Sequence, residues 1–121
     1  MAKRQHDLDR GVERMLALSG TYDDVHLEVA RGVTRPVWEP DRATMRLFET
    51  ARGIARGLGI ELTHHSAGGG SDGNFTGAVG IATLDGLGAI GKGYHTLEEY
   101  IELDSLVTRG RLFAGLLAEL R

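Results

Sequence analysis

The sequence predicts an α/β protein, because stretches with helical and with strand periodicity alternate along its 121 residues. In residues 45–58, apolar side chains recur at intervals of three and four, which is typical of a helix with one buried face. In residues 25–29, apolar and polar side chains alternate, as they do in a strand with one solvent-exposed face. Most of the excess glycine lies in residues 53–93, so this excess is local and marks loops.

The composition restricts the function classes. Hydrophobic residues make up 41% and charged residues 26% of the chain, as in ordinary soluble domains. The net charge is −3 and no basic block with interleaved aromatics occurs, which argues against a nucleic-acid partner. No apolar stretch approaches the ~20 residues that cross a bilayer, and the opening MAKRQHDLDR lacks the apolar run of a secretory signal. The lack of such a stretch predicts a protein without membrane contact. Since the chain also has no cysteine, we expect it to be cytoplasmic.

The first third predicts a helix, a strand and an extended connector. Asp7 is expected to cap a short helix that ends at residues 18–20. The alternating residues 25–29 form the strand. The following segment, TRPVWEP, holds two prolines and therefore excludes a helix. Within it, Trp38 is expected to be buried at a domain junction.

The remainder alternates helices with short strands. Residues 41–58 are expected to form a helix, GIELTHH a short strand, and the residues from about Asp72 a second, shorter helix. GIATLDG is typical of a buried strand and EEYIEL of a short extended piece. Asp104 is expected to cap the last helix. The apolar stripe of this helix is expected to lie in the core, and it consists of Leu106, Leu112, Phe113, Leu116, Leu117 and Leu120.

The segment GGGSDGNF, residues 68–75, lies between an expected strand and a helix start. Glycines allow positive φ angles and close backbone approach, and free N–H groups at a helix start favour an anion, either a phosphate or a carboxylate. A nucleotide-binding Walker loop ends in Gly-Lys-Ser or Gly-Lys-Thr, and this ending is absent. In the later glycine-rich stretch GAIGKGYH, Lys92 is followed by Gly93. A nucleotide-phosphate site is therefore the weaker alternative.

The order of TRPVWEP, a long helix, GGGSDGNF, GIATLDGLG and GYHTLEEY resembles the C-terminal part of the two-zinc amidohydrolase and carboxypeptidase superfamily. Glutamate carboxypeptidase, acetylornithine deacetylase and succinyl-diaminopimelate desuccinylase belong to it, and the glutamate carboxypeptidase branch is the most similar. The resemblance covers essentially the whole chain. It implies that residues 1–32 are the last helix and strand of an α+β lid domain that mediates dimerisation. Residues 33–40 would then be the connector, and residues 41–121 the final third of the α/β catalytic domain.

The resemblance also implies one metal ligand and one substrate-binding arginine. His95 in GYHTLEEY is similar to the last zinc ligand of the family; the alternative is a loop histidine without a ligand. Arg35 is similar to an arginine that clamps the carboxylate of the substrate, for which its bidentate fork is suited. The alternative is that Arg35 covers apolar surface or pairs with Glu39. His64 and His65 would face opposite sides of a strand, so ordinary packing is expected there.

In the family, the glycine-rich loop lines the substrate pocket. By this resemblance, the loop of this chain would hold the anionic group of a substrate. Asp72 is expected to cap the helix and to fix the loop. The contacts to the substrate are expected from Gly69, Gly70, Ser71 and Asn74.

The sequence departs from the family in its metal ligands. No His-x-Asp pair occurs, and the adjacent Glu98–Glu99 follows His95 instead of preceding it as the catalytic pair of the family does. Each zinc ion of such a centre needs three or four protein ligands. We therefore expect no catalytic residue in this chain and no stoichiometric zinc on the chain alone.

The function implied by the resemblance is that of a C-terminal fragment of a zinc hydrolase. The parent enzyme would cleave the amide bond of an N-acyl amino acid or a short peptide with a free carboxylate, and a complementing N-terminal fragment would be needed for activity. The alternative is a non-enzymatic module that associates with itself or binds carboxylates, because a fragment leaves strand edges and apolar helix faces exposed.

Overall fold

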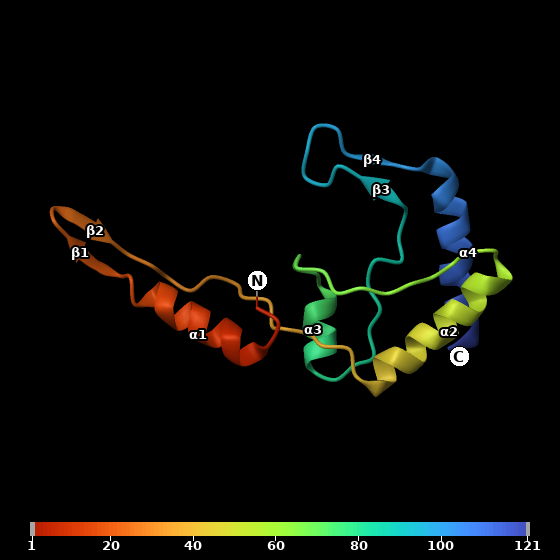
Figure 1. The fold of residues 1–121 in the computed structure, drawn as a ribbon, viewed down its shortest axis with the longest axis horizontal. Helices are drawn as coiled ribbons and strands as arrows, with labels where there is room; N and C mark the ends of the chain where they lie inside the picture. The colour runs from red at the N-terminus through yellow and green to blue at the C-terminus, as the bar shows by residue number, and fades with distance from the viewer. Residues whose placement is uncertain (1, 121) are drawn as a thin grey trace. The chain divides into compact units, whose positions relative to one another are not determined.

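The computed structural model describes residues 2–120, in the order α1, β1, β2, α2, α3, β3, β4, α4 (Figure 1). The chain divides into two compact units. The first contains the residues up to Glu39 together with Ala67–Ile81, and the second contains Pro40–Ser66 together with the residues from Ala82 onward. The predicted mixture of helices and strands is confirmed, although the strands are few and short.

In the first unit, helix α1 (Gln5–Leu16) leads into a hairpin of β1 (Gly20–Tyr22) and β2 (Val25–Leu27). The two strands are antiparallel. The strand predicted at residues 25–29 thus forms but ends earlier, and β1 was not predicted. The prediction that Asp7 caps α1 is wrong: the helix begins earlier, and Asp7 lies inside its first turn. An acidic side chain there still faces the positive end of the helix dipole.

The proline-containing connector has no helix or strand, as predicted. It lies against α3 (Gly73–Ala78), the short helix after the glycine-rich loop. Trp38 is half-buried, and an added Cβ at Gly77 would collide with its indole ring. The missing side chain at Gly77 therefore lets α3 approach the connector.

In the second unit, α2 (Arg42–Gly57) packs on α4 (Leu103–Glu119) (Figure 1). Helix α2 is confirmed as predicted, and the carboxylate of Asp41 caps it by accepting a hydrogen bond from the Thr44 amide at 2.7 Å. The helices approach closely at Gly115, where an added Cβ would lie 2.7 Å from Cγ2 of Ile54. Their buried apolar side chains are Phe48, Ala51, Ala55, Leu112 and Leu116.

The second hairpin pairs β3 (Gly91–Lys92) with β4 (Tyr100–Ile101) in antiparallel fashion, just before α4. The buried hydroxyl of Ser105 joins this hairpin to α4: it accepts a hydrogen bond from the Ile90 amide at 2.9 Å and donates to the carbonyl of Glu102. The prediction that Asp104 caps α4 is wrong, because Glu102 holds the N-cap position and Asp104 lies in the first turn.

The strands predicted at GIELTHH and GIATLDG do not form. The described part of the chain has two sheets of two strands each, and neither segment belongs to them. A strand is stabilised by hydrogen bonds to a neighbouring strand. The residue pattern identified segments that are suited to a sheet, but it could not supply that neighbour.

The apolar stripe of α4 is only partly buried. Leu112 and Leu116 are 0% and 4% exposed, as predicted, because they face α2. The other stripe residues are wrongly assigned to the core; the exposed ones are Leu106, Phe113, Leu117 and Leu120. The residue spacing shows which side of a helix is apolar, and it does not show whether another element covers that side.

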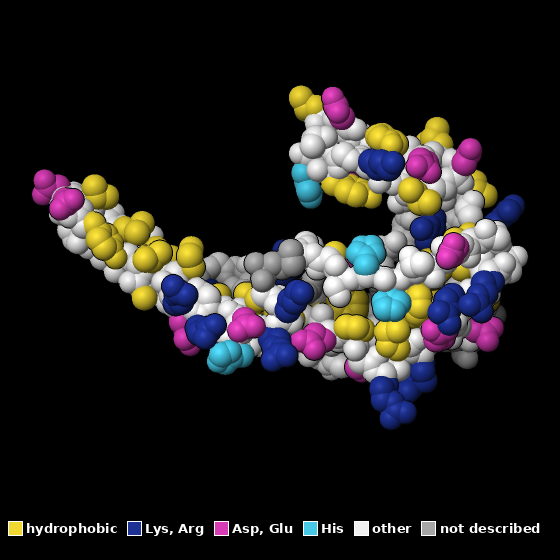
Figure 2. All heavy atoms as spheres, viewed as in Figure 1, with side chains coloured by type: hydrophobic (Ala, Val, Ile, Leu, Met, Phe, Trp, Pro, Cys, Tyr) yellow, Lys and Arg dark blue, Asp and Glu magenta, His cyan; other side chains and the backbone are white. Residues whose placement is uncertain are grey.

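Hydrophobic side chains also reach the surface along the β1–β2 hairpin (Figure 2). Tyr22, Val25 and Leu27 of this hairpin are exposed. Within residues 2–120, no helix combines the length and the apolar character that a membrane span requires.

Candidate functional site

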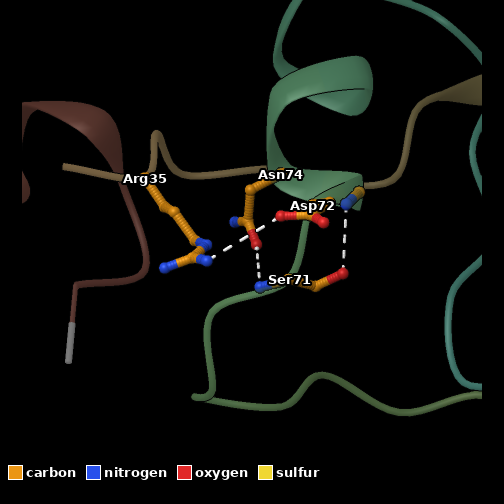
Figure 3. Close-up of polar contacts among 5 residues, drawn as sticks. Arg35, Ser71, Asp72 and Asn74 are labelled. Atoms are coloured by element: carbon orange, nitrogen blue, oxygen red, sulfur yellow. Dashed lines mark hydrogen bonds and ion pairs between the residues drawn. The ribbon is translucent and has the colours of Figure 1, made fainter. Parts of the chain in front are cut away.

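Arg35 and the glycine-rich loop come together in the first unit (Figure 3). The side chain of Arg35 passes directly over Gly70, where an added Cβ would lie 2.7 Å from Cδ and 3.3 Å from Nε. Real Cβ atoms do not come that close to a carbon atom, so any side chain at position 70 would move Arg35. At Gly69, in contrast, an added Cβ would meet nothing within 4 Å. Arg35 and Gly70, which were both expected to bind the substrate, are therefore in contact.

Ser71 and Asn74 hold the loop in shape. The Ser71 amide donates a hydrogen bond to Oδ1 of Asn74 at 2.9 Å, and the Gly73 amide donates to Oγ of Ser71 at 3.0 Å (Figure 3). Nδ2 of Asn74 donates to the carbonyl of Pro36 at 2.8 Å, which ties the loop to the connector beside Arg35. The polar groups of Asn74 are thus occupied within the chain. The backbone N–H groups of Gly69 and Gly70 donate to no other described group.

Asp72 does not cap α3, contrary to the prediction. It occupies the N-cap position, but its φ and ψ of −67° and −23° are helical and its side chain makes no capping hydrogen bond. A capping side chain requires an extended backbone at that position, and Ser71 accepts the amide of the first turn instead. The carboxylate of Asp72 lies 3.8 Å from Nη2 of Arg35. Arg35 therefore pairs with Asp72 and not with Glu39.

His95 lies in the loop between β3 and β4, in the second unit. Its φ of 65° is in the left-handed region, which a residue with a side chain adopts at a cost in strain. The His95 amide donates a hydrogen bond to Oε2 of Glu99 at 3.3 Å, and Oγ1 of Thr96 donates to the carbonyl of Gly93 at 2.7 Å. These hydrogen bonds hold the loop and leave His95 exposed.

The described residues do not fit a metal centre. In residues 2–120, no three His, Asp or Glu side chains gather where they could share an ion. Glu99 is the acidic side chain that contacts His95, and it does so at the backbone amide instead of the imidazole. Since a zinc ion needs three or four protein ligands, His95 could contribute one ligand to a centre whose other ligands lie elsewhere.

The remaining polar candidates have structural contacts. His64 packs edge-on against Phe48, with ring centroids 4.8 Å apart and an interplanar angle of 78°, as expected for ordinary packing. A surface depression at the end of α2 is lined by Arg52, Arg56 and residues 59–63, and it contains none of the predicted site residues.

Residue patterns missed two contacts at this site, the pairing of Asp72 with Arg35 and the hydrogen bond between Asn74 and the connector. Both join residues that are far apart in the sequence. No local residue pattern pointed to either contact.

The sequence model of peptidase family M20/M25/M40 matches residues 9–119. No curated protein and no solved structure matches the chain. The match extends over well more than half of the sequence and includes the residues that surround Arg35 and the loop around His95. The chain therefore belongs to peptidase family M20/M25/M40.

Proposed function

We propose that this chain supplies the carboxylate-binding part, and one metal ligand, of a zinc-dependent hydrolase. The substrate would be an N-acyl amino acid or a short peptide with a free carboxylate, as in carboxypeptidases and deacylases. Membership of a peptidase family supports the hydrolase class. The glutamate carboxypeptidase branch is the proposed relationship within that class.

The position of Arg35 carries the proposal. Its side chain is half exposed, with 48% of the side-chain surface accessible, so a ligand can reach it. The amides of Gly69 and Gly70, in the loop that approaches Arg35 at Gly70, have no acceptor among the described groups and are open to an external anion. A guanidinium with nearby backbone N–H groups is suited to a carboxylate, because it offers two parallel donors together with a positive charge.

The donor set limits what the chain can do alone. His95 lacks companion ligands among the described residues, and no glutamate is placed beside a metal site to act as a general base. The proposal is that a second polypeptide, which carries a His-x-Asp pair and an adjacent Glu–Glu, completes the zinc centre.

The experiment is a complementation assay. The purified chain is mixed with zinc and with a family polypeptide that carries the missing motifs, and the hydrolysis of an N-acetyl amino acid is measured. We expect no hydrolysis by either polypeptide alone and activity from the mixture. His95→Ala should abolish this activity, whereas His65→Ala, at an exposed histidine outside the site, should leave it intact. Activity that survives His95→Ala would refute the metal-ligand assignment.

Self-association without catalysis is the second candidate function. The exposed apolar side chains of α4 favour it, because contiguous exposed apolar surface is typical of interfaces. Those that α2 leaves uncovered are Leu103, Leu106, Val107, Phe113, Leu117 and Leu120. Sedimentation at increasing concentration tests this function, and a chain that stays monomeric throughout would exclude it.

A further inference from the structure

The ion pair between Arg35 and Asp72 is loose. The distance of 3.8 Å between Nη2 of Arg35 and the carboxylate of Asp72 exceeds the roughly 2.7–3.2 Å of a hydrogen bond. The side chain of Asp72 is 97% exposed, so water solvates the carboxylate on nearly all sides. Such exposed pairs contribute little free energy, and either partner can exchange.

Arg35 has close neighbours other than Asp72. Its Cδ and Nε lie where a Cβ at Gly70 would be 2.7 and 3.3 Å away, and the hydrogen bond from Asn74 to the carbonyl of Pro36 fixes the connector next to Arg35. Asp72 has no capping role in α3, and its side chain contacts no other described polar group. The carboxylate of Asp72 is therefore a companion of the guanidinium and not its support.

We propose that Asp72 is an internal substitute for the carboxylate of the ligand. In the free chain its carboxylate stands beside Arg35, and an external carboxylate must displace it in order to bind. This inference rests on the proposed function of Arg35. The ligand class is a monocarboxylate of the N-acyl amino acid type, with its carboxylate at Arg35.

The substitute lowers the affinity for the ligand in two ways. In part of the molecules Arg35 is paired with Asp72 and cannot bind the ligand. The apparent dissociation constant for the ligand rises as the fraction of molecules with a free Arg35 falls. In addition, the negative charge of Asp72 repels an incoming anion at short range. Because both groups are exposed, we expect an effect of about two- to fivefold on the affinity.

The test is a titration with N-acetylglycine, followed by the NMR shifts of the Gly69 and Gly70 amides in the chain. We expect Asp72→Asn to lower the dissociation constant by about two- to fivefold, and Asp72→Ala to do the same. The control Asp24→Asn removes the same charge at an exposed position in the β1–β2 turn and should leave the constant unchanged. Arg35→Gln should raise it.

The outcomes separate the two proposals. If Arg35→Gln weakens binding while both Asp72 variants bind as the wild type does or more weakly, then Asp72 is no competitor, and the carboxylate site itself stands. If the wild-type chain shows no saturable binding, or if Arg35→Gln leaves binding unchanged, then the carboxylate site and the exchange are both refuted. An equal gain in Asp24→Asn would attribute the effect to net charge and would overturn the specific role of Asp72.

Discussion

The contact between α2 and α4 depends on the missing side chain of Gly115. An alanine there would place Cβ 2.7 Å from Cγ2 of Ile54, whereas carbon atoms in contact are ~3.5–4.0 Å apart. The contact must therefore open by about 1 Å. Ile54 cannot turn away easily, because a β-branched side chain has one strongly preferred χ1 rotamer in a helix.

Gly110 provides a matched control in the same helix, since an added Cβ at this position would meet nothing within 4 Å. A glycine-to-alanine change in a helix interior contributes about 1 kcal/mol through helix propensity, and this gain applies at both positions. Overpacking at Gly115 costs about 1–3 kcal/mol. We therefore expect Gly110→Ala to stabilise the chain and Gly115→Ala to be neutral or to destabilise it by up to about 2 kcal/mol.

The assay is urea unfolding followed by circular dichroism at 222 nm, from which the free energy of unfolding is obtained. The two variants should differ by about 1–3 kcal/mol. Ile54→Ala removes the colliding methyl group, so the double variant with Gly115→Ala should destabilise by less than the sum of the two single changes. A Gly115→Ala chain that gains as much stability as Gly110→Ala would refute the close packing of α2 on α4.

Three further predictions concern single residues. Gly70→Ala should displace the flexible end of Arg35 and weaken the binding of N-acetylglycine, while the free energy of unfolding changes by less than about 0.5 kcal/mol. The control Gly69→Ala should leave binding unchanged. If the NMR titration gives the same dissociation constant for both variants, this prediction is contradicted. Nη1 of Arg109 is buried without a described partner, so Arg109→Met should maintain or raise the free energy of unfolding in urea. The control Arg111→Met, at an exposed position of α4, should show no such gain. The hydrogen bond from the Thr44 amide lowers the pKa of Asp41. The stability contributed by that carboxylate should therefore be fully present above the unfolded-state pKa of about 3.9 and disappear as the pH falls through the lower folded-state value. Asp41→Asn, which keeps an acceptor oxygen, should flatten this pH dependence of α2 helicity.

The helices could be predicted because their signals are local. The apolar spacing that predicted a helix over residues 41–58 lies within a few turns of the chain, and α2 forms there. Its cap at Asp41 was not predicted, although the hydrogen bond to the Thr44 amide joins residues only three positions apart. The caps at Asp7 and Asp104 were wrong by a few residues, since an aspartate is also favoured inside the first turn by the helix dipole.

The strands and the core could not be predicted as well, because they depend on contacts between distant residues. A segment such as residues 59–65 has the composition of a strand, yet a strand forms only beside a partner. The stripe of α4 likewise shows an apolar side, and Leu112 is buried while Phe113 is exposed because α2 covers one part of it.

The role of Arg35 and the loop residues in substrate binding is still a prediction. The loop residues and Arg35 were identified from two short motifs, and they meet in the first unit. The position of the Asp72 carboxylate could not be predicted, because it follows from the helical backbone angles at that residue. The role of His95 as a ligand is still a prediction.

Trp38, which lies against Gly77, has a practical consequence. It is the single tryptophan of the chain, and it belongs to the first unit, whereas the two longest helices, α2 and α4, belong to the second. Intrinsic fluorescence therefore follows the environment of α3 and the connector, while ellipticity is dominated by the other unit. Unfolding curves recorded by the two probes on one sample will coincide if the units melt cooperatively, and will separate if each unit melts by itself.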